Sequence, residues 1–150
     1  MEELQRKISD SVVETIHLVR PGDLNSVGRL FGGTLMMWID EVAATVAKRH
    51  SHMEVTTLSI DKLLFMHGAY LNDTIVVSGK MVYVGNSSML VRVETRVENI
   101  EGEQHVINEA YITLVGLDKM NKPSRVPRLL LETDEERAAW RDAEERKRKS

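Results

Sequence analysis

The stretch from Thr34 to His50 reads TLMMWIDEVAATVAKRH, and it decides the fold predicted for this 150-residue chain. It contains no glycine or proline, and its alanine, leucine and methionine residues favour a helix. Apolar side chains would cover almost the whole circumference of that helix, which is typical of a buried helix rather than a surface one. We therefore expect one long central helix that other elements enclose.

Strand-like runs lie on both sides of this helix. One run precedes it, from Val12 to Val19, and four follow it: Val55–Phe65, Thr74–Val84, Ser87–Glu98 and Gln104–Leu117. In the third of these four, apolar residues alternate with charged ones, which is the period of a half-buried strand. Short turns between consecutive strands predict an antiparallel meander. A single sheet can enclose a helix only by curling around it, so the predicted class is α+β with a wrapped sheet.

The last stretch of the chain, from Leu131 to Ser150, is highly charged. Thr133 and Glu136 form a capping-box pattern, and acidic residues lead while basic residues close, as the helix dipole favours. We predict a solvated surface helix over residues 133–148, outside a core of about residues 10–130, within a single domain of residues 1–150. A nucleic-acid or membrane arm is the weaker interpretation, because the acidic residues offset the basic cluster.

Composition excludes several classes of function. The chain has no cysteine, so it has neither a disulfide scaffold nor a cysteine zinc site. Its net charge of -3 produces no general attraction to nucleic acid. No apolar run approaches the roughly 18 residues of a membrane span, and the charged start lacks the apolar segment of a secretory signal. We expect a cytosolic protein that binds neither nucleic acid nor membrane.

Asp40 is the anomaly of the central helix. A carboxylate inside an apolar segment is costly unless it is paired or hydrogen-bonded. In one interpretation, Asp40 or its neighbour Glu41 faces a wet edge of the helix or pairs with Lys48 or Arg49. In the other, Asp40 is a general base or a nucleophile. Both interpretations stay open at this point.

Gly32 and Gly33 stand where the helix is expected to begin. Free backbone N–H groups and the positive end of the helix dipole would bind an anion or oxyanion there, although a glycine pair is also typical of a tight turn. Gly33 precedes Asp40 by seven residues, about 10.5 Å along a helix, and hydrogen-bond reach is only about 3 Å. If both residues act on one substrate, the carboxylate comes from another copy of the helix, and a two-fold dimer would supply two such mixed sites.

Other candidate groups carry weaker signals. Asn25 is either a turn residue that hydrogen-bonds its own backbone or an amide that orients water. No serine lies in a G-x-S-x-G setting, which disfavours a serine hydrolase. His50 and His52 lack the H-E-x-x-H spacing and a nearby third ligand, so we expect no metal site. We expect the His67 imidazole at the surface, with the lining of a pocket as the alternative.

The segment NSVGRLFGGTLMMWIDEVAA, from Asn25 to Ala44, resembles the hotdog-fold acyl-CoA thioesterases. More narrowly, it resembles the bacterial YciA-type and the cytosolic brain-type acyl-CoA hydrolases. Three later motifs agree in order: TLSIDKLLF at Thr57–Phe65, VGNSSM at Val84–Met89, and the pair Val126-Pro127 followed by Glu132-Thr133. The resemblance extends over about residues 10–145.

This resemblance implies a long helix wrapped by an antiparallel sheet, dimers with a continuous sheet, and trimers of dimers, that is, a homohexamer. It implies hydrolysis of acyl-CoA to a free fatty acid and coenzyme A, with no cofactor apart from the coenzyme A in the substrate. By the same resemblance, Asp40 corresponds to the catalytic carboxylate and Asn25 to an asparagine contributed by the opposing subunit. The backbone N–H near Gly33 would bind the thioester oxygen.

Acyl-CoA binding is expected at further residues of these motifs, namely Gly32, Thr57, Gly85, Asn86, Ser87 and Ser88. The chain departs from the family pattern in the loop after Phe65 and at Asn86, where some relatives carry a lysine or arginine. The phosphates of coenzyme A would then be bound elsewhere, by Arg49, Lys62 or Arg125. Two other functions stay open: a hotdog hydratase or dehydratase, which would favour a histidine near the helix, and a non-catalytic acyl-CoA-binding module.

Overall fold

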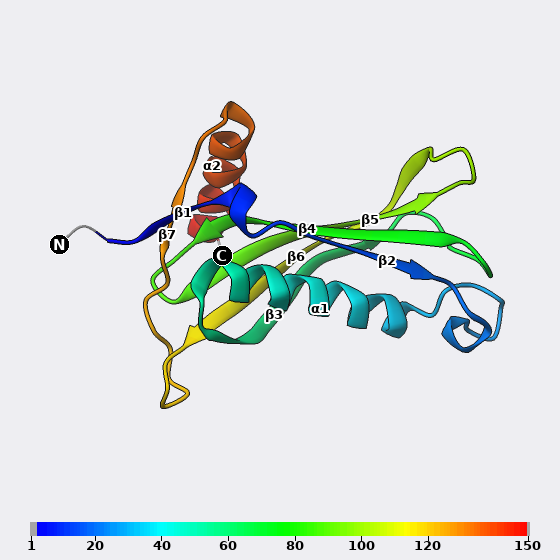
Figure 1. The fold of residues 1–150 in the computed structure, drawn as a ribbon, viewed down its shortest axis with the longest axis horizontal. Helices are drawn as coiled ribbons and strands as arrows, with labels where there is room; N and C mark the ends of the chain where they lie inside the picture. The colour runs from blue at the N-terminus through cyan, green and yellow to red at the C-terminus, as the bar shows by residue number, and fades with distance from the viewer. Residues whose placement is uncertain (1–2, 150) are drawn as a thin grey trace.

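A long helix lies against one face of a curved sheet in the computed structural model, which describes residues 3–149 (Figure 1). The helices are α1 (Gly32–Ser51) and α2 (Asp134–Lys149), with two single-turn 3-10 helices, η1 (Ile8–Asp10) and η2 (Pro21–Asp23). The strands are β1 (Gln5–Lys7), β2 (Val13–Leu18), β3 (Glu54–Phe65), β4 (Thr74–Val84), β5 (Ser88–Glu98), β6 (Gln104–Leu117) and β7 (Arg128–Leu130). The predicted α+β class is confirmed.

The main sheet has the strand order β2-β4-β5-β6-β3, and every neighbouring pair is antiparallel. β4, β5 and β6 form the expected meander, but β3 pairs with β6 at the far edge rather than with β4. The prediction of one meander through all four later strands is therefore wrong for β3. The physical reason is the link over residues 66–73, whose eight residues are more than the two to five, roughly, of a hairpin loop.

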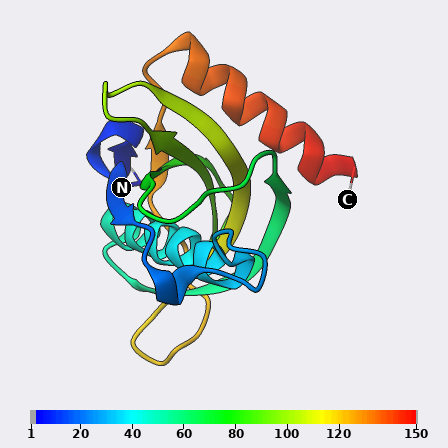
Figure 2. The same cartoon turned by 90° about the vertical axis from the view of Figure 1, so that its right-hand side faces the viewer.

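Helix α1 lies on the concave face of the sheet, where the sheet curls around one side of it (Figure 2). Its buried apolar side chains are Leu35, Trp38, Ile39, Val42, Ala43, Val46 and Ala47. The opposite side of the helix is open, with Met36 39% and Met37 52% exposed. The expectation that the helix is enclosed all round is therefore wrong for a single chain, because one sheet covers it from one side only.

Helix α2 packs on the outer face of the sheet, opposite α1 (Figure 2). Trp140 of α2 packs against Tyr83 of β4 with the two rings tilted by 36° and their centroids 4.2 Å apart. The predicted N-terminal cap is present, since the Thr133 hydroxyl accepts a hydrogen bond from the Glu136 N–H at 3.0 Å. A short parallel pair of β1 with β7 forms a separate two-stranded sheet, which the sequence pattern did not predict because strands of three residues carry no periodicity. Among residues 3–149 no helix is long and apolar enough to span a bilayer.

Candidate functional site

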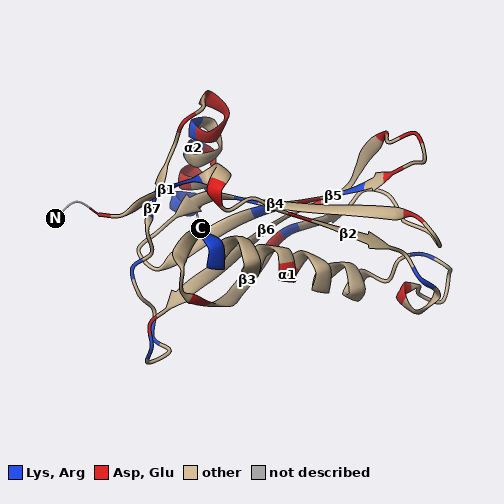
Figure 3. Cartoon of the chain, in the orientation of Figure 1, with Lys and Arg blue, Asp and Glu red and all other residues tan. Residues whose placement is uncertain are grey.

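Asp40 lies halfway along α1, at the edge of the helix that faces β3. Its side chain is half-buried, and the Thr57 hydroxyl of β3 donates a hydrogen bond of 2.7 Å to Asp40 Oδ1. Figure 3 shows an acidic band at this level of an otherwise largely uncharged helix. The carboxylate is thus held by a neutral donor at a position that solvent or a ligand can reach.

The cations considered as partners of Asp40 bind elsewhere. The Lys48 ammonium lies 3.9 Å from the Glu54 carboxylate, and the Arg49 guanidinium donates a hydrogen bond of 2.9 Å to the Val12 carbonyl. The interpretation in which Asp40 faces a wet edge of the helix fits this geometry better than the one in which it forms an ion pair. Such an edge is also the position that a catalytic carboxylate needs.

The first turn of α1 presents backbone N–H groups ahead of its first helical hydrogen bond. The helix begins at Gly32, its N-cap residue Phe31 makes no side-chain capping bond, and no acidic residue occupies the first turn. The first bond runs from the Leu35 N–H to the Phe31 carbonyl at 3.1 Å. The N–H groups of Gly32, Gly33 and Thr34 therefore precede it, at the positive end of the helix dipole. A group that develops negative charge would be stabilised there.

Asn25 uses its side-chain oxygen within its own loop. Oδ1 accepts hydrogen bonds from the backbone N–H groups of Val27 and Arg29, both at 3.0 Å. The turn interpretation of Asn25 is therefore confirmed for this oxygen, and Nδ2 is the atom left to donate to a ligand. Asn25 and Gly32 line a common pocket of about 320 Å³, together with the exposed His67.

The two parts of the candidate site do not meet within one chain. The pocket at the start of α1 contains Asn25 and Gly32, whereas Asp40 and Thr57 lie further along the helix and are not among its lining residues. The helical rise of about 10.5 Å between Gly33 and Asp40 is too long for one small reacting group to span. The candidate residues therefore form two separate groups within one chain, one with backbone donors and an amide, the other with a carboxylate.

The turn over residues 85–88, which contains Gly85, Asn86, Ser87 and Ser88, lies two strands from Thr57. Leu114 of β6 pairs on one side with Thr57 of β3 and on the other side with Met89 of β5, which directly follows the turn. The chain itself fills much of the turn's hydrogen-bonding capacity. Arg128 donates to the Gly85 carbonyl at 2.6 Å, and Arg125 donates to Asn86 Oδ1 at 2.9 Å. The Ser87 carbonyl accepts the Gly116 N–H at 2.9 Å.

Ser88 lines a larger pocket of about 610 Å³ between β3 and α2. Lys62, one of the three expected phosphate ligands, lines the same pocket with Arg146 and Lys147. The sequence did not predict that Arg146 and Lys147 line a pocket, because basic residues at the C-terminal end of a helix are already explained by the helix dipole. A helical spacing that points Ala143, Arg146 and Lys147 to one side was the available signal.

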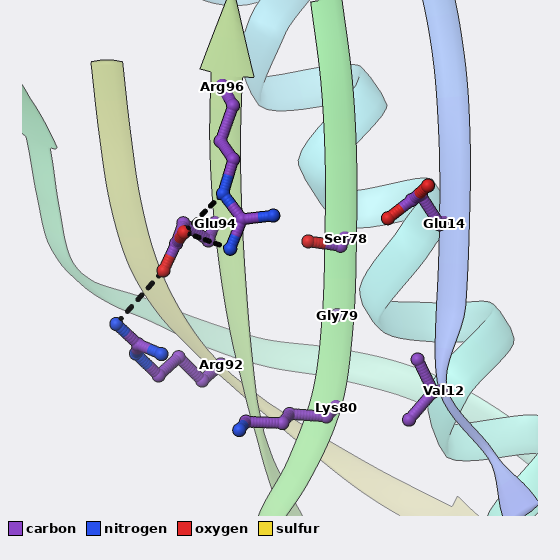
Figure 4. Close-up of a pocket in the computed structure, with 8 residues that line it drawn as sticks. All are labelled: Val12, Glu14, Ser78, Gly79, Lys80, Arg92, Glu94 and Arg96. Carbon is purple, nitrogen blue, oxygen red and sulfur yellow. Dashed lines mark hydrogen bonds and ion pairs between the residues drawn. The ribbon is translucent and has the colours of Figure 1, made fainter. Parts of the chain in front are cut away.

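A third hollow, of about 220 Å³, lies on the outer face of the sheet and is charged (Figure 4). Glu94 accepts hydrogen bonds from Arg92 at 3.2 Å and from Arg96 at 2.6 Å. Arg92 also binds Glu109 at 2.9 Å, and this hydrogen bond holds the pKa of the Glu109 carboxyl below its ordinary value. These charges neutralise one another, which makes the hollow a structural network rather than a candidate ligand site.

The histidines near the end of α1 have separate partners. His50 is buried, and its Nε2 donates a hydrogen bond of 2.8 Å to the Pro127 carbonyl, while His52 Nδ1 accepts from Arg6 at 3.0 Å. Burial lowers the pKa of the His50 imidazole. Within residues 3–149, no three His, Cys, Asp or Glu side chains lie close enough together to hold a metal ion.

Comparison with known proteins gives one consistent result. The family model of the thioesterase superfamily matches residues 27–103. The chain is 36% identical over 132 residues to the uncharacterized acyl-CoA thioester hydrolase YkhA of Bacillus subtilis, covering 87% of this chain and 77% of YkhA. It is 34% identical over 143 residues to the cytosolic acyl coenzyme A thioester hydrolase of Mus musculus, covering 93% of this chain but only 37% of that longer protein.

Solved structures agree over nearly the whole chain. A hexameric acyl-CoA thioesterase in its apo form superposes with a TM-score of 0.92 at 33% identity, covering 97% of this chain and 94% of that one. An acyl-CoA hydrolase of Staphylococcus aureus, solved with butyryl coenzyme A, coenzyme A and coenzyme A disulfide, superposes with a TM-score of 0.91 at 32% identity, covering 97% and 89%. Variants of that enzyme with one aspartate, one asparagine or one threonine replaced by alanine have also been solved.

Proposed function

Since this chain belongs to the acyl-CoA thioester hydrolases of the thioesterase superfamily and has their hotdog fold, as its motifs predicted, we propose that it cleaves acyl-CoA to a free fatty acid and coenzyme A. The observation that carries the proposal is the Asp40 carboxylate, held by Thr57 on the open edge of α1. The N–H groups at the start of the same helix supply the complementary half-site.

In the proposed reaction Asp40 assists attack on the thioester carbonyl. As a general base, it takes a proton from a water molecule whose oxygen attacks the carbonyl carbon. As a nucleophile, it attacks that carbon itself, and water then hydrolyses the resulting anhydride. In both routes the carbonyl oxygen gains negative charge that the Gly33 N–H stabilises, the C–S bond breaks, and the coenzyme A thiolate takes up a proton. Because the chain has no cysteine, a covalent route cannot use a thiol nucleophile.

Each site is proposed to form between two subunits of a dimer. Asp40 and Thr57 would come from one subunit. In the partner subunit, the Gly33 N–H would bind the thioester oxygen and Asn25 Nδ2 would orient water. The separation of about 10.5 Å within one helix supports this arrangement, as do the exposed apolar side chains that a second copy would cover. These are Met36 and Met37 on α1 and Leu58, Leu64 and Phe65 on β3.

The Staphylococcus aureus hydrolase supports the choice of residues. The asparagine, aspartate and threonine substituted in its variants are separated by 15 and then 17 positions along that chain. Asn25, Asp40 and Thr57 are separated by the same 15 and 17 positions. The hexameric relatives further support a homohexamer for this protein.

The test of the catalytic proposal is release of coenzyme A from acyl-CoA substrates of different chain lengths. Asp40→Asn should lower kcat on the order of 10²–10⁴-fold, the usual contribution of a general base. Glu41→Gln is the matched control, since it removes the neighbouring, exposed carboxylate and should leave kcat near the wild-type value. Full kcat in a folded Asp40→Asn variant would show that Asp40 is not the catalytic carboxylate.

The shared site can be tested separately by mixing subunits. Asp40→Asn and Asn25→Ala proteins, each inactive alone, should regain activity after dissociation and reassociation, because a mixed dimer contains one intact site. Random mixing should restore about one quarter of the wild-type activity for two-fold dimers. Absence of recovery, with mixed dimers detected by mass spectrometry, would place both residues in one subunit's site.

A cytosolic location is also part of the proposal. The relative from Mus musculus is named a cytosolic hydrolase. Fractionation of cells that express the full chain should recover it with the soluble proteins, whereas sedimentation with membranes would contradict this assignment.

A further inference from the structure

Two buried polar side chains of neighbouring strands have oxygen atoms that no other group of the chain binds. Thr95 of β5 and Asn108 of β6 are fully buried, each with an exposed fraction of 0%. Within residues 3–149, neither the Thr95 hydroxyl nor Asn108 Oδ1 has a hydrogen-bond partner. Buried polar atoms are nearly always hydrogen-bonded in folded proteins. An unpartnered pair therefore indicates that a group from outside the chain binds there.

The two residues lie opposite each other on the face of the sheet that packs against α1. Thr95 pairs with Asn108 across β5 and β6. Val93 lies two residues before Thr95, and a Cβ on Gly79 would contact both the Val93 side chain and Val42 of α1. Alternate residues of a strand share a face, so the Thr95 side chain also lies on the α1 side. Its hydroxyl therefore stands within the apolar core.

A bulge in β6 turns Asn108 toward the same space. Thr95 is opposite Asn108, but the next residue of β5 is opposite Val106, so Ile107 is an extra residue in β6. Consecutive residues of a regular strand face opposite sides of the sheet, yet Ile107 and Asn108 are both buried. Bulges of this kind redirect a side chain, and they are frequent next to active sites.

The polar pair lies behind the pocket at the start of α1. Ile107 lines that pocket, and so does Phe65, which pairs with Asn108 across β3 and β6. Asn108 Nδ2 donates a hydrogen bond of 2.5 Å to the Leu64 carbonyl. This bond fixes the amide while Oδ1 stays able to accept a hydrogen bond. The pair therefore stands at the inner end of the pocket.

The lining of this pocket suits an acyl chain. Its apolar members are Leu30, Leu35, Phe65, Met66, Ala69 and Ile107. Gly32 also lines it, and the next residue, Gly33, supplies the N–H proposed to bind the thioester oxygen. Coenzyme A carries amides and phosphates, whereas a simple acyl chain carries only methylene and methyl groups, so the acyl end of the substrate is the part that this lining favours. Phe65 also belongs to the surface proposed to face the partner subunit, so the pocket borders that interface.

We propose that Thr95 and Asn108 determine which acyl chains are accepted, an inference that rests on the proposed function. A chain whose methyl end stops before the pair leaves space for a water molecule that donates to Asn108 Oδ1 and accepts from the Thr95 hydroxyl. A longer methyl-ended chain displaces that water and leaves both oxygen atoms without a hydrogen bond, which is costly for buried polar groups. A chain of the same length that ends in a hydroxyl group replaces both hydrogen bonds. The pair therefore selects shorter methyl-ended chains, and hydroxyl-ended chains that reach it.

The test is the dependence of kcat/KM on chain length in the coenzyme A release assay, with straight acyl-CoA substrates and their terminally hydroxylated counterparts. For the wild type, kcat/KM should rise with length and then fall, and just past the maximum the hydroxylated chain should be the better substrate. Thr95→Val replaces the hydroxyl with a methyl group of similar size. It should raise kcat/KM for that longer methyl-ended chain about tenfold relative to shorter chains, and it should remove the advantage of the hydroxylated chain. Asn108→Leu should change the profile in the same direction.

Thr74→Val is the matched control, because Thr74 is a half-buried threonine of β4 that does not line the pocket. It should leave the chain-length profile unchanged. Urea unfolding gives an independent measurement: since the Thr95 hydroxyl has no partner among residues 3–149, Thr95→Val should keep or raise the midpoint. The proposal would be overturned by an unchanged profile in Thr95→Val, by an equal change in Thr74→Val, by equal rejection of methyl-ended and hydroxyl-ended chains, or by a lower midpoint.

Failure of the proposed function would appear differently. Acyl-CoA thioethers cannot be hydrolysed, so calorimetry with them measures affinity without turnover. Their dissociation constants should follow the same order of chain lengths, and Thr95→Val should again favour the longer chain about tenfold. This binding pattern without hydrolysis of any thioester would contradict the catalytic proposal alone, whereas hydrolysis with a profile that does not depend on Thr95 would contradict only the present inference.

Discussion

Replacement of Gly79 by alanine is predicted to destabilise the fold where β4 packs against α1. A Cβ at this position would lie 2.8 Å from Val42 Cγ1, 3.2 Å from Val46 Cγ2 and 3.4 Å from Val93 Cγ2. All three valines are buried in the core, so they have little room to move away. The methyl group can be accommodated only if α1 or β4 shifts.

The magnitude follows from two opposing effects. Overpacking of a well-packed core costs roughly 1–3 kcal/mol. Replacement of glycine by alanine also reduces the entropy of the unfolded chain, which returns about 0.4–1 kcal/mol. The expected result is a net loss of about 1 kcal/mol in the free energy of unfolding, together with lower kcat, since Val42 lies two residues after Asp40 on the displaced helix.

Urea unfolding at a fixed protein concentration measures this loss, because any self-association makes apparent stability depend on concentration. The midpoint should fall while the slope stays unchanged. Gly22→Ala is the control, since a Cβ at Gly22 meets no atom within 4 Å and should cost nothing. Adding Val42→Ala to Gly79→Ala should cost less than the sum of the two single changes. A Gly79→Ala protein as stable as the wild type would refute this account of the interface.

Two further predictions concern single side chains. Thr57→Val should lower kcat/KM in the coenzyme A release assay about tenfold, because Asp40 loses a charge-assisted hydrogen bond worth roughly 1.5 kcal/mol. The control, Thr57→Ser, keeps the hydroxyl, so its kcat/KM should stay within about threefold of the wild type. An equal loss of kcat/KM in both variants would contradict a role for the hydroxyl. Burial lowers the pKa of the His50 imidazole below its ordinary value of about 6.5, so the unfolded chain binds that proton more readily than the folded one. The contribution of His50 to the free energy of unfolding should be fully present above about pH 6.5 and decrease as the pH falls below it. Urea midpoints measured across this range should decrease less for His50→Gln than for the wild type. Part of the decrease should remain in the variant, because burial also lowers the pKa of His17. An unchanged acid-side decrease would show that His50 does not contribute.

Much of the secondary structure was predictable because its signals are local. The strands at Thr74–Val84 and Gln104–Leu117 have the bounds predicted from the sequence, and the long helix follows from a glycine-free apolar stretch. Register and strand order are not local. β3 was expected beside β4, yet it pairs with β6, because partner choice depends on how the chain crosses the sheet after Phe65.

The candidate site was predictable in its residue types more than in its geometry. Asp40 stands out in the sequence because a carboxylate interrupts an apolar helix, and Gly33 because it precedes that helix. The hydrogen bond from Thr57 and the use of Asn25 Oδ1 within its own loop could not be predicted, since both depend on side-chain contacts formed after folding. Arg146 was interpreted only as a favourable charge at a helix end for the same reason.

The sequence by itself determined the α+β class, the helix with its carboxylate, and the argument that one helix cannot bring Gly33 and Asp40 together. These depend on periodicity, composition and the rise of a helix, all of which are set by neighbours along the chain. Only the tertiary structure decided that one side of α1 stays open, that β3 forms an edge, and that the C-terminal cations lie beside Gly85 and Lys62. Those features depend on contacts between segments far apart in sequence, and such contacts are determined by packing of the whole chain.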